Sequence, residues 1–276
     1  MMRAPLDWMR NSPLQGLAAL VVGGGSGIGE AVCRTLAANG ASVAIGDIAF
    51  ANAQQVASSI NDDNGGKGSS EHAIALPLDI SNPDDIAAGV AKTVASFGRL
   101  DIVVDCAAIV FAAKLEDCTP QDWRRSFDVN VLGALLLARA CLPHLRNSPA
   151  ASIVNVSTLG WIWGRPNSGP YAPSKGALTT LTRQMALEWA EYGVRVNAVN
   201  PGTILTPLAR ATLPEAVRER RARDIPLGRL GTPREMADLI VFLASPAASY
   251  ITAQAFNCDG GHSQALFRDV DDPPTG

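Results

Sequence analysis

The stretch LVVGGGSGIGE, residues 20–30, is an apolar run that breaks into a cluster of glycines and then into a helical pattern. It predicts a buried strand, a glycine-rich turn and the start of a helix. Glycines permit positive φ angles and close backbone approach, and a helix start directs free N–H groups at the loop. Such a turn suits an anionic pyrophosphate, although an ordinary tight turn is the alternative, because the G-x-x-x-G-x-G spacing alone is a weak signal. The loop residues expected at the phosphates are Gly23, Gly25, Ser26, Gly27, Ile28 and Gly29.

The composition is that of one ordinary globular domain. The chain has 276 residues, of which 47% are hydrophobic and 18% charged, and no linker or charge block divides it. The formal net charge is −3, which argues against nucleic acid as a partner. We place the domain at residues 17–262, between an N-terminal extension (1–16) and a C-terminal tail (263–276).

No targeting or membrane segment is predicted. Residues 1–13 carry Arg3, Asp7 and Arg10 without a sustained apolar core, and nowhere does an apolar run reach the length of about 18 residues that a membrane span needs. The 5 cysteines and 3 histidines are scattered, without a C-x-x-C pair. We therefore expect a cytoplasmic protein with reduced thiols, and we predict no disulfide framework, metal site or His-based catalytic triad.

Strand and helix patterns alternate along most of the chain. The predicted strands are apolar throughout, which favours a parallel sheet covered by helices on both faces. The expected fold is a single doubly wound, Rossmann-like α/β domain. Strands are expected at 17–22, 42–47, 73–78, 102–106, 152–156 and 194–199, with one more near the C-terminus. Helices are expected at 28–38, 50–60, 83–97, 123–145 and 173–190, before a last helix.

An acidic residue ends the second predicted strand, SVAIGD. Asp47 follows Gly29 by 18 positions, close to the spacing of about 20 at which a dinucleotide fold places a carboxylate on the adenosine ribose. The carboxylate would accept hydrogen bonds from the ribose hydroxyls and repel a 2′-phosphate. Asp47 therefore predicts NAD rather than NADP as the cofactor.

A tyrosine and a lysine lie four residues apart in YAPSK, residues 171–175. At the start of a helix this spacing projects both side chains from one face, so that Tyr171 and Lys175 can act on one substrate group. A phenol titrates near about 10 and needs a neighbouring cation to exchange protons near neutrality. The pair therefore indicates proton transfer.

Further short motifs accompany this pair along the chain. In order they are GGGSGIG at 23–29, LDI at 78–80, the Asn of FDVNVLG at 130, SIVNVST at 152–158, YAPSK at 171–175, NPGTILT at 200–206 and DGG at 259–261. Together they resemble the short-chain dehydrogenase/reductase family, and the resemblance covers essentially residues 17–261. It implies hydride transfer between a nicotinamide cofactor and a secondary alcohol or ketone.

The resemblance also implies roles for individual residues. Tyr171 is then the general acid/base, Lys175 supplies the cation and holds the nicotinamide ribose, and Asn130 anchors a water leading from the lysine to solvent. An amide that satisfies a helix kink is the alternative for Asn130. Further cofactor contacts are implied for Asp47, Ile48, Asp79, Ile80, Cys106, Ala107, Ala108, Tyr171, Lys175, Pro201, Gly202, Ile204 and Thr206.

Two adjacent hydroxyls compete for one further role, because the family places a serine beside the tyrosine to polarise the substrate oxygen. Thr158 lies 13 positions before Tyr171, the usual distance of that serine. Neighbours at a strand end point to opposite faces, so only one of Ser157 and Thr158 can face the nicotinamide. The count favours Thr158, with Ser157 as the alternative if the loop carries an extra residue.

Two motifs depart from the family pattern. Val22 stands where threonine is usual before the glycine loop, which removes a hydroxyl that braces the turn. Asp105-Cys106-Ala107-Ala108 replaces Asn-Asn-Ala-Gly after the fourth strand. A buried carboxylate and an extra methyl are therefore expected beside the cofactor, and the carboxylate requires partners.

Two later features bear on the substrate. Trp161 and Trp163 lie where the family lines its substrate pocket, and an aromatic wall suits a ring, an acyl chain or a sugar face; burial in a subunit interface is the alternative. Residues 205–229 form a mobile lid in relatives, and five of the arginines in this segment could bind a carboxylate or phosphate. The alternative is a solvated helix face with Glu219 paired to Arg223. The arginines are Arg210, Arg218, Arg220, Arg221 and Arg223.

Three functional hypotheses follow. The favoured one is an NAD-dependent oxidoreductase of small secondary alcohols or ketones, because the Tyr/Lys pair is intact and because Ser26 and Ile48, where NADP-preferring relatives often carry a base, are neutral. The second is an NADP-dependent 3-oxoacyl-thioester reductase, to which the lid arginines point. The third is a non-catalytic dinucleotide sensor. The family resemblance further implies a homotetramer.

Overall fold

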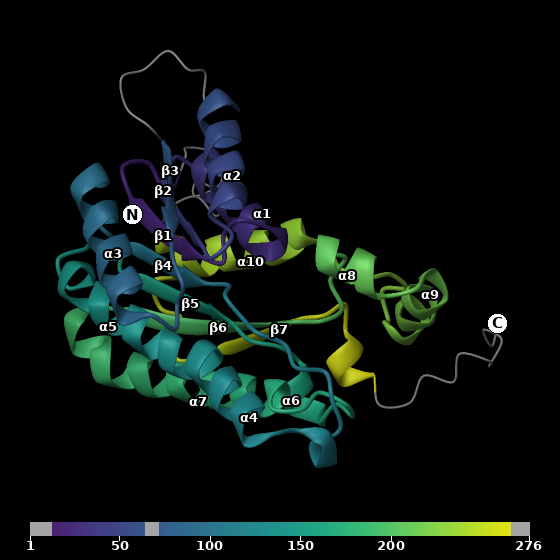
Figure 1. Ribbon diagram of the computed structural model, residues 1–276. Helices are drawn as coiled ribbons and strands as arrows, with labels where there is room; N and C mark the ends of the chain where they lie inside the picture. Colours follow the sequence, from purple (N-terminus) through teal and green to yellow (C-terminus); the bar gives the residue numbers. More distant parts are fainter. Residues whose placement is uncertain (1–12, 64–71, 266–276) are drawn as a thin grey trace.

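The computed structural model describes residues 13–63 and 72–265 and has a parallel sheet at its centre (Figure 1). The strand order is β3-β2-β1-β4-β5-β6-β7, and each neighbouring pair is parallel. The predicted doubly wound, Rossmann-like fold is therefore confirmed. The strands are β1 (Ala18–Val22), β2 (Ser42–Asp47), β3 (Ala73–Pro77), β4 (Ile102–Asp105), β5 (Ser152–Val156), β6 (Arg195–Pro201) and β7 (Ala255–Cys258).

The central strands are apolar throughout because each of their faces meets a different core. In β1, Ala19 and Val21 belong to one hydrophobic cluster, and Leu20 and Val22 belong to the other. Successive side chains of a strand point to opposite faces, so a strand with helices on both sides has no solvent-facing position. The unbroken apolar pattern in the sequence is the direct result.

Two layers of helices cover the sheet, and Figure 1 shows them on opposite faces. The helices α1 (Gly27–Ala38), α2 (Phe50–Asp63) and α10 (Pro233–Ala244) pack on the first cluster. The helices α3 (Pro83–Phe97), α5 (Ala134–Leu145) and α7 (Tyr171–Trp189) pack on the second. Both layers leave the carboxyl ends of the strands uncovered, which is where ligands bind in open α/β sheets.

The helix predicted at 123–145 forms, but it starts earlier and contains a π-helical turn. Thr119 makes a capping box with Asp122, so α4 (Pro120–Phe127) begins at Pro120. A π-helical turn over Asp128–Gly133 then joins α4 to α5. In the described residues this continuous helix, Pro120–Leu145, is the one that is long and apolar enough to cross a membrane. Its α5 part packs into the core of the domain.

The described residues extend the predicted domain slightly at both ends. Leu14, assigned to the N-terminal extension, is fully buried in the core, and its N–H donates to Asn39 O at 3.1 Å. Ser263, assigned to the tail, donates its N–H to the Asp259 carboxylate at 2.6 Å. Residues 1–12 of the predicted extension, and the tail from residue 266, lie outside the described residues.

The predicted lid stands apart from both helix layers. It contains α8 (Pro207–Thr212) and α9 (Glu215–Asp224) and lies beyond the carboxyl ends of β6 and β7 (Figure 1). The expected pair between Glu219 and Arg223 is not among the ion pairs of the described residues. Glu215 pairs instead with Arg218, one turn further along α9.

Candidate active site

The turn between β1 and α1 requires its glycines. A Cβ on Gly29 would lie 2.0 Å from the carbonyl oxygen of Gly23, and one on Gly23 would lie 2.8 Å from Ala107 N. Gly23 and Gly27 also have positive φ angles, of 76° and 58°, which L side chains rarely adopt. At the start of α1 the Ser26 side chain makes no capping hydrogen bond. The first N–H groups of α1 are therefore free of a side-chain cap and can receive an anion.

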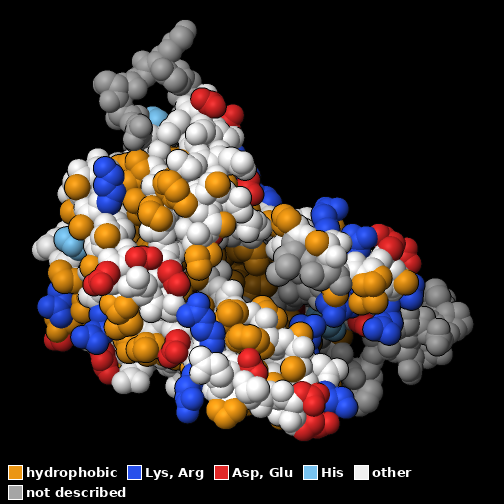
Figure 2. Space-filling model, in the orientation of Figure 1, with side chains coloured by type: hydrophobic (Ala, Val, Ile, Leu, Met, Phe, Trp, Pro, Cys, Tyr) orange, Lys and Arg blue, Asp and Glu red, His pale blue; other side chains and the backbone are white. Residues whose placement is uncertain are grey.

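A cleft of about 490 Å³ opens beside this turn at the carboxyl ends of the strands. The same region is visible as the hollow between the body and the lid in Figure 2. Most of the predicted cofactor residues line this cleft. They are Gly23, Ser26, Gly27, Ile28, Gly29, Asp47, Ile48, Asp79, Ile80, Cys106, Ala107, Ala108 and Thr206.

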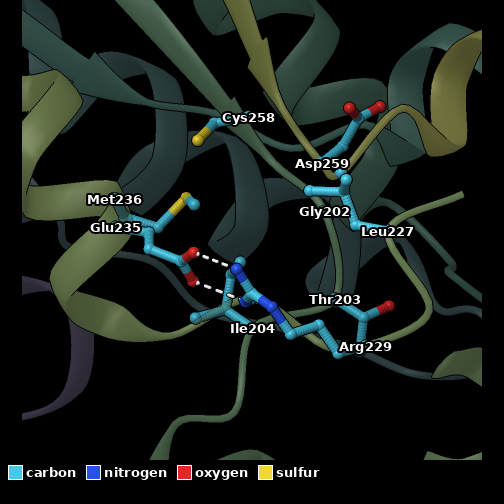
Figure 3. Close-up of a pocket in the computed structure, with 11 residues that line it drawn as sticks. Gly202, Thr203, Ile204, Leu227, Arg229, Glu235, Met236, Cys258 and Asp259 are labelled. Carbon is cyan, nitrogen blue, oxygen red and sulfur yellow. Dashed lines mark hydrogen bonds and ion pairs between the residues drawn. The ribbon is translucent and has the colours of Figure 1, made fainter. Parts of the chain in front are cut away.

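The other predicted cofactor residues, among them Tyr171 and Lys175 on α7, are not among the residues that line this cleft. The N–H of Gly25 faces Asp47, and Pro201 is buried at the end of β6. Gly202 and Ile204 line a separate, smaller cavity of about 110 Å³ beneath the base of the lid (Figure 3). This cavity is bordered by an ion pair in which Arg229 donates to both oxygens of Glu235, at 2.6 and 3.1 Å. Glu235 also caps α10, so this pair ties the end of the lid to that helix.

Asp47 is held in place by backbone groups. Its Oδ2 accepts a hydrogen bond from Gly25 N and its Oδ1 accepts one from Ala49 N, both at 2.8 Å. Each oxygen keeps acceptor capacity toward the cleft, because a carboxylate oxygen has two lone pairs. Among the described residues that line the cleft, Arg125 is the basic one, and it lies beside Asp79 at 3.9 Å. The edge of the cleft at Asp47 is therefore acidic.

The structure separates the two competing hydroxyls. The Tyr171 hydroxyl is hydrogen-bonded to the side chain of Thr158. Ser157 is buried and turned toward α7, where its Oγ donates to Lys175 O at 3.0 Å and lies 2.9 Å from Thr179 Oγ1. Thr158 thus joins Tyr171, whereas the Ser157 hydroxyl is occupied in packing β5 against α7.

The two titratable groups of the YAPSK motif are both perturbed by burial. Burial raises the pKa of Tyr171, and the hydrogen bond with Thr158 and the positive charge of Arg165 oppose this rise. Lys175 is almost fully buried, and its Nζ donates to Val156 O at 2.7 Å. Burial lowers the pKa of Lys175, and the nearby Asp105 raises it. Burial therefore favours the neutral form of both side chains, and the neighbouring charges and the hydrogen bond oppose it.

Asn130 fixes the loop that follows β4. Its Oδ1 accepts from Ile109 N at 2.9 Å, and its Nδ2 donates to Ile109 O at 3.0 Å and to Ser174 Oγ at 2.9 Å. No hydrogen bond to Lys175 occurs in the described part of the chain. The amide lies in the π-helical turn, so the helix irregularity and the contact of Asn130 with the Ile109 backbone occur together, as the alternative interpretation expects.

Asp105 is the buried carboxylate that the sequence led us to expect. It is 1% exposed, and its Oδ1 accepts from Ala107 N at 3.0 Å. Its Oδ2 has no hydrogen-bond partner within the described ranges. Burial raises the pKa of Asp105 to about 6, against the opposing charge of Lys175. The position of a family amide is therefore taken by an acid that has incomplete hydrogen bonding and a lysine as its electrostatic partner.

Two tryptophans lie in α6 (Gly160–Trp163), the short helix after β5. The Trp161 indole N–H donates to Asn200 Oδ1 at 3.2 Å. Trp163 remains 46% exposed and packs edge-on against His262, with 4.7 Å between ring centroids. Trp163 is therefore accessible from solvent in the single chain, whereas Trp161 is half-buried.

Sequence reasoning missed several residues at the site. Leu78, Ile109, Val110 and Pro207 line the cleft, and their apolar character alone does not distinguish them from core residues. The positive charge of Arg165 lowers the pKa of Tyr171, although Arg165 lies in a loop without a periodic pattern. No sequence signal marks it, because its role depends on how that loop folds.

Comparisons with known proteins agree with this geometry. A family model described as enoyl-(acyl carrier protein) reductase matches residues 22–263. Cis-4-hydroxycyclohexanecarboxylate dehydrogenase of Sinomonas cyclohexanicum is 38% identical over 246 residues, which are 89% of this chain and 96% of that protein. The 3-oxoacyl-[acyl-carrier-protein] reductase FabG of Thermotoga maritima is 38% identical, over 90% of this chain and 98% of that protein.

A solved structure supports the same relationship. The 3-ketoacyl-(acyl-carrier-protein) reductase of Brucella melitensis, crystallised in complex with NADH, superposes with a TM-score of 0.82 at 35% identity, over 91% of this chain and 99% of that one. Sequence similarity of this extent over nearly the whole length goes beyond a shared fold. The chain therefore belongs to the short-chain dehydrogenase/reductase family and is an oxidoreductase that acts on CH–OH groups.

Proposed function

We propose that this protein transfers hydride between NAD(H) and a small secondary alcohol or ketone, with Tyr171 as the general acid/base. The observation that carries the proposal is the hydrogen bond between the Tyr171 hydroxyl and Thr158. Lys175 lies on the same helix, and its Nζ donates to the carbonyl oxygen of Val156, which lines the cleft. Proton exchange with the substrate oxygen requires a positioned acid whose pKa its surroundings can adjust. The carbonyl oxygen of a ketone would accept hydrogen bonds from both hydroxyls.

The groups around Tyr171 have different roles in reduction and in oxidation. In reduction, Tyr171 donates its proton to the oxygen, and Thr158 donates a second hydrogen bond that stabilises the developing negative charge. In oxidation, Tyr171 accepts the proton, and the positive charges of Lys175 and Arg165 favour its deprotonated form. Burial of the site strengthens these interactions, because the local dielectric constant is low.

The cleft fits a nicotinamide dinucleotide. The turn at Gly23 and Gly29 leaves no room for a Cβ, the start of α1 is uncapped by side chains, and Asp47 presents a carboxylate at the neighbouring strand end. The glycine turn would hold the pyrophosphate and Asp47 the adenosine ribose. The bound cofactor would supply the hydride donor or acceptor.

Asp47 supports NAD over NADP. A 2′-phosphate at this edge would meet the Asp47 carboxylate, and the basic residue among the described cleft residues, Arg125, is engaged by Asp79. The related reductase of Brucella melitensis was crystallised with NADH, which fits this preference.

The experiment is a panel of secondary alcohols and ketones assayed with both cofactors. The panel includes 4-hydroxycyclohexanecarboxylate, because the relative from Sinomonas cyclohexanicum is named for it. Tyr171→Phe is expected to lower kcat by about 10² to 10⁴ while cofactor binding persists. Lys175→Met is expected to weaken both turnover and NAD binding, the latter measured by calorimetry. A Tyr171→Phe enzyme with the kcat of the natural protein would overturn the mechanism.

Two relatives that are named acyl-carrier-protein reductases favour a second candidate, reduction of a 3-oxoacyl thioester. NADP is the cofactor that we expect for this candidate from the sequence, and neither relative's name supports it. The same panel separates the two functions when a 3-oxoacyl thioester is added to it. A kcat/KM for the thioester with NADPH well above every free alcohol or ketone would select the second candidate.

We also propose a cytoplasmic homotetramer. All 5 cysteines are free thiols, which suits a reducing compartment. Leu132 and Leu187 are 46% and 74% exposed on the long helices, and subunit contacts there or around residues 259–261 would cover apolar surface. Light scattering that finds a stable, active monomer would overturn the tetramer.

A further inference from the structure

The lid helix α9 turns basic side chains inward. Val217, Arg218, Arg221 and Ala222 are half-buried, and Ile225 just after the helix is buried, whereas the remaining positions of α9 are exposed. A surface helix normally places apolar residues on its inner face. Two of these four half-buried positions are arginines, so the inner face of the lid combines apolar and cationic groups.

Neither of the two arginines is fully satisfied. Arg218 pairs with Glu215, but its Nε is buried without a hydrogen-bond partner in the described part of the chain. Arg221 makes no hydrogen bond or ion pair with any described residue. Burial lowers its pKa, and the positive charges of Arg165 and Arg220 lower it further. Arg221 thus faces like charges rather than an acid.

Arg165 links the basic face of α9 electrostatically to Tyr171. Its positive charge acts both on Arg221 and on the Tyr171 hydroxyl, although it makes no ion pair with the described residues. It follows Trp163 by two positions, and Trp163 packs on His262. The end of the lid also lies close to this segment, because Leu227 N donates to Gly260 O at 3.2 Å, two residues before His262. Basic side chains are also numerous over α9 in Figure 2.

A cationic pair without a counter-charge is electrostatically unfavourable, and an anion placed between the two would relieve it. The Trp163 ring offers an apolar contact next to this charge. A planar carboxylate suits guanidinium groups, which can bind it with two parallel hydrogen bonds. The arrangement therefore fits a ligand that combines an apolar body with a carboxylate.

We propose that Arg165 and Arg221 form a subsite for a carboxylate of the substrate, so that the substrates of this enzyme are secondary hydroxy acids or oxo acids. The proposal rests on the proposed function and names its substrate class. The carboxylate binds Arg165 and Arg221 at the mouth of the site, the apolar body lies on Trp163, and the hydroxyl or carbonyl reaches Tyr171.

The test compares a cyclic hydroxy acid with its primary amide, which has nearly the same shape without the charge. The natural protein is expected to prefer the acid by about 10- to 100-fold in kcat/KM, the range that one or two charge-assisted hydrogen bonds produce. Arg165→Gln and Arg221→Gln are expected to remove most of this preference. The rate with the amide should stay nearly unchanged in Arg221→Gln, whereas Arg165→Gln should lower it for acid and amide alike, because the charge of Arg165 also acts on Tyr171. Arg223→Gln, the same charge loss on the exposed face of α9, is the matched control and keeps the preference.

A binding measurement makes the outcome independent of turnover. Calorimetry with cyclohexanecarboxylate, which cannot react, is expected to give a Kd that rises by a similar factor in Arg165→Gln and Arg221→Gln but not in Arg223→Gln. Equal kcat/KM for acid and amide in the natural protein, or an equal effect of the control, would overturn the subsite while leaving the proposed function intact. Absence of turnover with every alcohol and ketone would overturn the proposed function, and the calorimetry would still decide the subsite.

Discussion

Replacing the buried carboxylate at the end of β4 by its amide should make the protein more stable at neutral pH. Asp105 is 1% exposed, and one of its oxygens has no hydrogen-bond partner in the described residues. Burial raises its pKa from 3.8 to about 6. At 1.36 kcal/mol per pKa unit this corresponds to about 3 kcal/mol by which the ionised carboxylate disfavours folding.

The sign follows from proton binding. Because the folded state holds the Asp105 proton more tightly than the unfolded state, stability falls as pH rises from about 4 to about 6 and then stays lower. Asp105→Asn carries no titrating group, so its free energy of unfolding should exceed that of the natural protein by an amount that grows over this interval. The gain in the free energy of unfolding is at most about 3 kcal/mol. Asp105→Asn also removes the negative charge that stabilises the buried Lys175 ammonium, and this loss reduces the gain.

The assay is urea unfolding of both proteins from pH 4.5 to 7.5, at one protomer concentration because subunit association would shift the apparent stability. The quantity compared is the difference between variant and natural protein at each pH, in which the other titrating groups cancel. A difference that does not change with pH, or that decreases as pH rises, would refute the reasoning that Asp105 is ionised and under-compensated at neutrality.

The remaining predictions concern single side chains. Asp101→Asn should destabilise the protein by about 3 kcal/mol at pH 7. Burial alone would raise the pKa of Asp101, but hydrogen bonds from Arg99, Ser148 and the Ala18 N–H hold that pKa below its ordinary value. The advantage of the natural protein should therefore shrink below about pH 4, which the urea assay shows when it is extended below that pH. Thr158→Ala should lower kcat by about 10² to 10³ and Thr158→Ser should restore it, while a larger loss of kcat in Ser157→Ala would reassign the hydroxyl. Asp47→Ser should reduce the ratio of kcat/KM for NAD to that for NADP, and an unchanged ratio would show that another residue sets the preference.

Local patterns in the sequence were sufficient for the fold. Unbroken apolar runs predicted the buried strands, and the glycine cluster predicted the turn where Gly29 meets the Gly23 carbonyl at a distance that excludes a Cβ. The YAPSK pattern predicted that Tyr171 and Lys175 lie at the start of one helix, which is α7. These features depend on neighbours within a few residues, so the sequence displays them directly. The predicted helix at 123–145 was also correct in position, but its π-helical turn was not visible in the sequence.

Other features depended on contacts between distant segments, and only the tertiary structure decided them. The sequence could count from Tyr171 to Thr158, but the direction of the Ser157 hydroxyl depends on how β5 packs against α7. Gly202 and Ile204 belong to a motif that the sequence associated with the cofactor, yet they line a different cavity under the lid. The effect of the Arg165 charge on the pKa of Arg221 likewise couples a loop to the lid helix. Such contacts arise from the packing of whole elements, which no local pattern of residues encodes.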